Sequence, residues 1–487
     1  MSTKPDKHTL ADVEAGGARR RSRFSLEPLA VRSASWVEKW FPDTFVIALL
    51  AIVVVGVAAI AIGSTPATVM SSFGNGFWDL LPFAMQMAII IVGGYALASS
   101  KPVRTLIERL AAKPGTARGA VAFVAFCTMV SSLLSWGFSL IVGGLFARAM
   151  GRRKDLRVDY RAASAAGFMG IGATCLLGLS SAPALLHATP ESVPQTLYEI
   201  SGYIPLTQTM FSWRSGVLLL VMGTVSVLVA YYTAPTGDRI KTAADLGVDV
   251  TDEPADQKRS RPGEWLEYSP LLSIVIGGAM AVWIIGKVIS EGPLSAVSDL
   301  NSYNFLILTL ALLLHWRPRS FVQAASRATP ATSGVIIQFP VYAGIAGILV
   351  SATNGADMSL SHYLAEAFTW AGQYIGLPVV VGIYSIVMGL FVPSAGAKWA
   401  LEAPYVFEAA TESQTNFGWL VQVYSSTESL ANLINPFWML PLLGLVGLKA
   451  RNIVGYTLMY FIVLAPATLT AIWVLSIGVP WVPPVFP

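Results

Sequence analysis

The chain has 487 residues, of which 54% are hydrophobic and 12% are charged, and its formal net charge is +4. A soluble globular protein carries about 25% charged residues, so this composition excludes an ordinary soluble domain and predicts that most of the chain lies in a lipid bilayer. The absence of HExxH, P-loop and GxSxG motifs, and of metal-type cysteine spacing, argues against an enzyme, a nucleotide-driven pump and a bound cofactor.

The apolar segments have the length of membrane-crossing helices. Residues 1–35 are polar and basic and are predicted to be a cytoplasmic tail, because the first long apolar run starts too late for a cleavable signal peptide. The later runs approach the roughly 20 residues that a helix needs to cross a bilayer. Crossings are expected at residues 45–63, 80–100, 216–232, 270–288, 305–314, 332–350 and 453–477. Because an apolar segment in lipid must satisfy its own backbone hydrogen bonds, the predicted fold is an all-α polytopic membrane protein.

The lysines and arginines predict the orientation of these crossings, because cytoplasmic loops collect them. Of the 32 basic residues, 29 fall in six clusters. The clusters precede Trp40 or lie at residues 101–118, 148–161, 239–261, 317–327 and 449–451. If all six face the cytoplasm, the N-terminus is cytoplasmic and the protein is a multi-pass protein of the inner membrane. Topology then explains the basic residues, so no nucleic-acid partner is expected.

Two stretches are predicted to enter and leave the membrane on the same side. Residues 119–147 lie between two basic clusters and are too short for two comfortable crossings, so a re-entrant hairpin is expected, with its tip in SSLLSWGFS (residues 131–139). Residues 378–406, which contain PSAGAKWALEAP, are expected to form a second hairpin that enters from outside. Broken crossings are expected after each hairpin, at residues 162–180 and 419–448.

The predicted elements repeat in inverted orientation. Each half runs crossing, crossing, hairpin, broken crossing, crossing, and residues 85–100 weakly match residues 337–352. Inverted repeats with interrupted helices are characteristic of secondary transporters. The expected units are a first transmembrane repeat (residues 36–232), a cytoplasmic linker (233–264), a connecting helix (265–299) and a second, inverted transmembrane repeat (300–487).

The hairpin tips and helix breaks are the predicted functional sites, because irregular backbone at membrane depth is tolerated only beside protein or a water-filled cavity. Helix N-termini at such breaks suit a carboxylate ligand. The predicted substrate-binding residues are Ser131, Ser132, Ser135, Trp136, Gly137, Ser394, Gly396, Lys398 and Glu402. Asn432 and Asn435 flank a break at Pro436 and are predicted to hold a coupling ion, with hydrogen bonding between helices as an equal alternative. His187 is expected in an outer loop, without a special role.

Lys398 and Glu402 are the ionisable residues that stand out, because a charge at membrane depth is costly and usually functional. Lys398 could neutralise a substrate carboxylate, and Glu402 could carry a coupling proton. Two structural alternatives remain open: the residues form an i,i+4 pair on one helical face, or Lys398 reaches water at the outer interface.

Several segments resemble the short-chain fatty acid transporter family, which belongs to a broader superfamily of ion transporters. They are WFPDTFVIALL (residues 40–50), residues 76–100, SWGFSLIVGG (135–144), IIQFPVYAGI (336–345), PSAGAKW (393–399) and NPFWMLP (435–441). The resemblance implies uptake of small monocarboxylates such as acetoacetate and butyrate, coupled to a proton or sodium gradient. It also implies an elevator mechanism, in which the hairpin domain slides against a scaffold, and a homodimer.

The chain departs from the family pattern at the hairpin tips. Ser135 stands where the family has asparagine, and Ala395 and Ala397 replace glycines. Lys398 and Glu402 stand where the family has uncharged polar residues. Two alternatives therefore stand beside a monocarboxylate transporter: a cation/proton antiporter with Glu402 as proton carrier, and a transporter-derived protein with an altered substrate.

Overall fold

The computed structural model describes residues 44–189, 193, 195–251, 259, 261–292, 300–390, 395–435 and 437–486. Within these residues the regular secondary structure is helical, and the extended pairing is limited to an isolated bridge between Gly202 and Val485. The prediction of an all-α fold is therefore confirmed. The predicted tail (residues 1–35) and the predicted site residue Ser394 lie outside the described residues.

The first half of the chain contains crossing helices, short amphipathic helices and a hairpin. The helices are α2 (Thr44–Ala61), α3 (Pro66–Gly76), α4 (Leu81–Ser99), α5 (Lys101–Ala111), α6 (Ala117–Leu134) and α7 (Trp136–Arg152). α3 and α5 were not among the expected crossings. Both begin with a proline in the first turn, where the missing N–H breaks no helical hydrogen bond.

An irregular segment interrupts the next crossing. α8 (Tyr160–Ala166) is followed by a π-helical turn (Gly170–Thr174) and a 3-10 turn (Cys175–Leu177), and the chain becomes α-helical again in α9 (Ala182–Ala188). Every residue of both turns is buried. Glycine allows the close packing: a Cβ on Gly178 would lie 2.4 Å from the Leu133 Cα atom in α6. A mid-helix π turn of this kind is often found at functional sites.

The rest of the chain is helical as well, within the described residues. The helices are α10 (Gln195–Ser201), α11 (Trp213–Thr233), α12 (Trp265–Tyr268), α13 (Leu271–Glu291), α15 (Leu300–His315), α16 (Pro318–Ala328), α17 (Ser333–Ser351), α18 (Leu360–Ile375), α19 (Leu377–Gly389), α20 (Ala395–Glu412), α21 (Phe417–Ala431), α22 (Leu440–Val446) and α23 (Ala450–Ser476). The chain bends by 119° between α18 and α19. The bend lies at Gly376, whose φ of +85° favours glycine.

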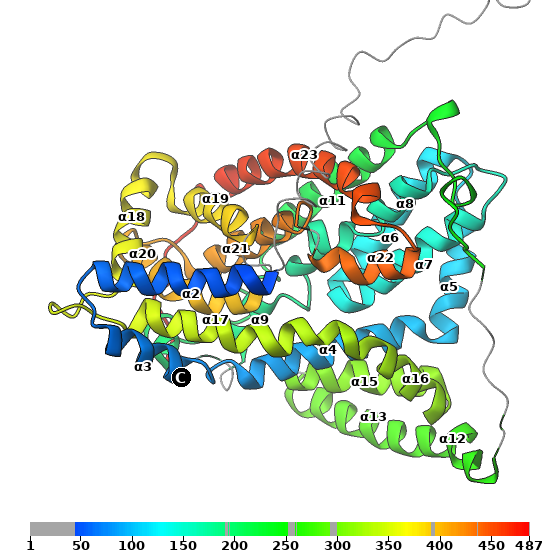
Figure 1. Cartoon of the computed structure of the whole chain (residues 1–487), viewed down its shortest axis with the longest axis horizontal. Coiled ribbons are helices and arrows are strands. Elements are labelled where there is room, and N and C mark those ends of the chain that lie inside the picture. The colour runs from blue at the N-terminus through cyan, green and yellow to red at the C-terminus, as the bar shows by residue number, and fades with distance from the viewer. Residues whose placement is uncertain are drawn as a thin grey trace, which may run out of the picture.

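Helices from each half of the chain pack against the other half. α2 and α3 contact α17, whereas α15 and α16 contact α4 (Figure 1). α6 and α7 form one hairpin, α19 and α20 contact each other, and α11 packs along α23. After α4 and after α17, a short helix, a hairpin, a broken crossing and a final crossing follow in the same order.

Several helices have the length and composition of membrane spans. Among the described residues five stretches qualify: Ala117–Leu134, Tyr160–Ala188, Trp213–Thr233, Pro262–Glu291 and Ala450–Ser476. In an apolar 18-residue window of the broken span Tyr160–Ala188, 94% is buried within the protein, whereas in such a window of Pro262–Glu291 only 11% is buried. The irregular backbone is thus enclosed by protein, as membrane depth requires, and α13 lies at the periphery.

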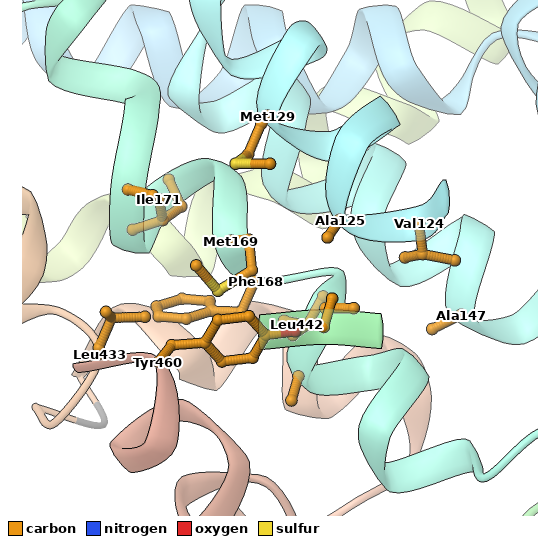
Figure 2. Close-up of a cluster of buried hydrophobic side chains, with 14 of the residues drawn as sticks. Val124, Ala125, Met129, Ala147, Phe168, Met169, Ile171, Leu433, Leu442 and Tyr460 are labelled. Carbon is orange, nitrogen blue, oxygen red and sulfur yellow. The ribbon is translucent and has the colours of Figure 1, made fainter. Parts of the chain in front are cut away.

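The largest buried core surrounds the irregular segment. Figure 2 shows Phe168, Met169 and Ile171 among side chains from neighbouring helices, including Met129 and Tyr460. Small residues bring α7 and α8 together here: a Cβ on Gly143 would lie 1.9 Å from the Gly167 carbonyl oxygen. This core fixes the hairpin against the broken crossing.

Replacing Gly143 with alanine is expected to lower the stability of the protein by about 1 to 3 kcal/mol, because the new methyl group meets backbone that must move. Thermal unfolding of the purified protein in detergent measures the change. Gly223→Ala is the matched control, since a Cβ there would have no atom within 4 Å apart from its chain neighbours and the backbone of its own helix. Equal transition temperatures for the two variants would contradict the close approach of α7 and α8.

Candidate functional site

The first hairpin breaks at a single extended residue, Ser135, with φ −155° and ψ 132°. Its hydroxyl accepts a hydrogen bond from the Phe138 N–H at 3.4 Å. The Ser180 hydroxyl accepts one from the Trp136 N–H at 3.0 Å. The first turn of α7 is therefore capped both by its own serine and by a serine from the broken crossing.

The hairpin tip is attached to the irregular segment by further hydrogen bonds. The Leu179 N–H donates to the Leu133 carbonyl oxygen at 2.7 Å, and the Ser132 and Thr174 hydroxyls lie 2.8 Å apart. The Ser131 hydroxyl donates to the Thr128 carbonyl oxygen of its own helix at 2.8 Å. The hairpin and the helix break thus form one connected unit.

The second hairpin and the second broken crossing meet in a similar way. α20 begins at Ala395, and Gly396 is buried. Asn432 follows the last residue of α21 and is 6% exposed. The Asn435 side-chain amide donates to the Leu390 carbonyl oxygen at 3.1 Å. This bond connects the break between α21 and α22 to the residue that follows α19.

These four structures surround one cavity. It offers about 60 Å³ to the centres of water-sized molecules, whereas a single water needs roughly 10–15 Å³. The lining residues are Met87, Trp136, Ile171, Cys175, Leu176, Ser180, Ala182, Val335, Phe339, Ala395, Gly396, Asn432 and Trp438. The Trp136 and Trp438 rings contact each other edge to face, with centroids 5.1 Å apart. The wall is mostly apolar, and Ser180 and Asn432 are its hydroxyl and amide residues.

The predicted site residues fall into three groups. Trp136, Gly396 and Asn432 line this cavity, and Gly137 lines a smaller cavity behind Trp136. The second group makes hydrogen bonds to neighbouring backbone or hydroxyl groups. Its members are Ser131, Ser132, Ser135 and Asn435. Sequence reasoning missed Val335 and Phe339, which reach the cavity only through tertiary packing.

The third group, Lys398 and Glu402, forms a buried ionic cluster with Glu428. The three side chains are at most 1% exposed. The Lys398 ammonium nitrogen lies 2.5 Å from a Glu428 carboxylate oxygen and 3.8 Å from a Glu402 carboxylate oxygen. It also donates to the Ser385 carbonyl oxygen at 3.0 Å. The i,i+4 pair is therefore formed, but the nearer partner is Glu428, which the sequence analysis missed.

Two other expectations are wrong. Lys398 is fully buried and does not reach interfacial water. His187 is fully buried in α9, where its Nε2 atom accepts a hydrogen bond from the Trp399 indole N–H at 2.9 Å. Its Nδ1 atom lies 3.4 Å from the Ser201 hydroxyl. Accepting at Nε2 requires a neutral ring, so His187 fixes the orientation of Trp399 beside Lys398.

Comparison with known proteins assigns the chain to a family. The family described as "Short chain fatty acid transporter" matches residues 25–475. The chain belongs to the short-chain fatty acid transporter family. An Escherichia coli (strain K12) protein assigned as a short-chain fatty acid transporter is 33% identical over 427 residues, which cover 86% of this chain and 93% of that protein. A Haemophilus influenzae (strain Rd KW20) protein with the same assignment is 30% identical over 454 residues, covering 91% and 98%.

A solved structure supports the fold of this family member. The crystal structure of the Alcanivorax borkumensis YdaH transporter, described as having an unusual topology, matches with a TM-score of 0.53 and 15% sequence identity. The match covers 91% of this chain and 100% of that chain. At this identity the likeness concerns the fold alone. This member of the short-chain fatty acid transporter family is thus a polytopic helical protein whose fold resembles that of a solved structure.

Proposed function

We propose that this protein is a secondary transporter that moves short-chain fatty acids or similar small monocarboxylates across the cytoplasmic (inner) membrane. The observation that carries the proposal is the cavity at which both hairpins and both broken crossings meet. The family to which the chain belongs is named for the same class of substrate.

The cavity has the two surfaces that a short-chain carboxylate needs. Ile171, Leu176 and Phe339 form an apolar wall for a short alkyl chain. Asn432 and Ser180 offer hydrogen-bond donors for a carboxylate, and the positive N-terminal end of α20 lies at the cavity through Ala395 and Gly396. A mostly apolar pocket with a few convergent polar groups is the usual form of a small-molecule site.

The architecture also supports a moving hairpin unit. We propose that residues 36–232 and 300–487 are inverted repeats, with residues 233–264 as a cytoplasmic linker, residues 265–299 as a connecting segment and the N-terminus in the cytoplasm. The repeated order of elements and the exchanged packing of α2–α3 and α15–α16 favour this arrangement. In the proposed elevator mechanism the hairpin unit slides against α4 and α17, is coupled to an ion gradient and works in a homodimer.

Asn432→Ala is expected to weaken butyrate binding about ten- to a hundredfold, because a hydrogen bond to a charged group contributes on the order of 1.5 to 3 kcal/mol. Trp136 and Trp438 border the cavity, so quenching of tryptophan fluorescence in the purified protein reports the binding. Trp136→Phe assigns the signal, and Asn452→Ala, at the start of α23, is the matched control. Saturable binding that Asn432→Ala leaves unchanged would place the substrate elsewhere.

A further inference from the structure

We propose that Glu402 and Glu428 together bind one transported proton, which crosses the membrane with each substrate anion. The inference rests on the proposed function and names its coupling ion and the residues that carry it. It starts from the buried ionic cluster, which lies beside the substrate cavity rather than in its wall.

The charges of the cluster do not balance when all three groups are ionised. Lys398 brings one positive charge and the two glutamates bring two negative charges, so the fully ionised cluster carries a net charge of −1. Moving an unpaired charge from water into a protein interior costs several kcal/mol even after the protein relaxes. Adding one proton to either carboxylate makes the cluster neutral. The cluster is therefore a site for one exchangeable proton, shared by two carboxyl groups.

The contacts identify the less stabilised carboxylate. Glu428 receives the short contact from Lys398, and the Ser385 hydroxyl lies 3.4 Å from the same Glu428 oxygen. Glu402 has the longer contact to Lys398, and the Tyr384 and Tyr424 hydroxyls face its carboxyl group, but neither of its buried oxygens makes a hydrogen bond of ordinary geometry among the described residues. Glu402 is therefore the carboxylate that takes up the proton when the substrate binds, and Glu428 stays ionised beside Lys398.

Among the described residues, the groups around the cluster supply no second positive charge. From α19 the Tyr384 hydroxyl faces Glu402, and it lies 2.8 Å from the Tyr405 hydroxyl of α20. From α21 the Tyr424 ring lies 4.8 Å from the Lys398 ammonium nitrogen. The thiol of Cys175 faces Glu428 from the irregular segment. All these groups are uncharged near neutral pH in their ordinary state, so they leave the balance unchanged.

The cluster is connected to the cavity through two helices. Lys398 lies two residues after Gly396 on α20, and Glu428 lies one helical turn before Asn432. An anion that enters the cavity adds negative charge near both carboxyl groups and favours the protonated state. One carboxylate and one proton carry no net charge, so the loaded protein crosses the membrane without moving charge through its potential.

The proton balance of the cycle is simple. A proton from water on the outer side forms an O–H bond with a carboxylate oxygen of Glu402 when the substrate binds. On the inner side that O–H bond breaks, the proton passes to water, and the substrate leaves as the anion. No oxidant, reductant or covalent substrate intermediate takes part.

Proton uptake upon substrate binding tests this inference with the full-length protein in detergent. Butyrate is added in weakly buffered solution at neutral pH, where the free acid is fully ionised, and a pH indicator counts the protons taken up. The wild type is expected to take up about one proton per butyrate bound. Glu402→Gln carries an amide that mimics the protonated carboxyl group, so it is expected to bind butyrate and take up none. Glu412→Gln, an exposed position on the same helix, is the matched control and should behave as the wild type.

A second measurement reports the proton without transport. The infrared band of a protonated carboxyl group should appear when butyrate binds to the folded protein, and Glu402→Gln should remove it while thermal unfolding shows that the variant is folded. Butyrate binding without proton uptake would overturn the coupling and leave the proposed function standing. Absence of any carboxylate binding would overturn both. A carboxyl band unchanged in Glu402→Gln and in Glu428→Gln would overturn the shared proton site.

Discussion

Lys398→Met is expected to destabilise the protein by about 3 to 5 kcal/mol, because removing one partner of a buried ion pair leaves uncompensated charge in the interior. The lysine holds Glu428 at 2.5 Å and Glu402 at 3.8 Å, and all three side chains are sealed from water. Methionine fills the same space but leaves two carboxyl groups, both of which must take up protons. Thermal unfolding in detergent measures the loss, which should be smaller at acidic pH, where both groups are protonated.

A second substitution separates the loss of charge from the loss of packing. Lys398→Met combined with Glu428→Gln leaves Glu402 as the cluster's remaining carboxyl group, and we expect this variant to recover much of the stability. The exposed pair Arg319 and Glu267 provides the control, because breaking a partly exposed ion pair has a small effect. A double variant as unstable as Lys398→Met would show that packing, rather than charge balance, holds the cluster.

Asp159→Ala is expected to lower the stability by about 3 kcal/mol, the scale of a lost helix cap with a buried donor left unpaired. The buried Asp159 carboxylate accepts hydrogen bonds from the N–H groups of Arg161, Ala162 and Lys241 at 2.9–3.1 Å. It also forms a 2.7 Å ion pair with the Arg161 guanidinium. One carboxylate therefore both starts α8 and holds the linker that follows α11.

Asp159→Asn tests which contribution matters. The asparagine oxygen still accepts backbone hydrogen bonds, so this variant should lie between the wild type and Asp159→Ala in thermal unfolding. Asp155→Ala, four residues earlier, is the control, because Asp155 is exposed. A hydrogen bond from Arg153 holds the pKa of the Asp155 carboxyl below its usual range, so the control also removes an ionised aspartate. Similar unfolding temperatures for Asp155→Ala and Asp159→Ala would contradict the role of Asp159.

The elements that sequence predicts well are those with strong local signals. The expected hairpin tip at residues 131–139 contains the observed break at Ser135, and an irregular run lies within the expected broken crossing at residues 162–180. Long apolar runs and small polar residues at their interruptions identify these features. The helices α3, α5, α16 and α18 were missed because they lie between such runs.

The candidate site depends on contacts that local spacing does not reveal. The spacing of Lys398 and Glu402 indicates an ion pair, but the nearer partner, Glu428, lies on another helix. The cavity wall from α4 and α17 consists of ordinary apolar residues such as Met87 and Phe339, which only the fold brings together. Likewise His187 reads as a loop residue until Trp399 is placed against it.

The most direct test of the central claim is counterflow of labelled butyrate and acetoacetate in proteoliposomes. Counterflow needs only alternating access, so it does not depend on the coupling ion. The experiment is run at neutral pH, where the anions predominate, and protein-free liposomes correct for diffusion of the neutral acids. We predict saturable accumulation of label that unlabelled butyrate inside the vesicles drives and that Asn432→Ala weakens. Label entry equal to that of protein-free liposomes, with folded protein present, would contradict transport of short-chain monocarboxylates.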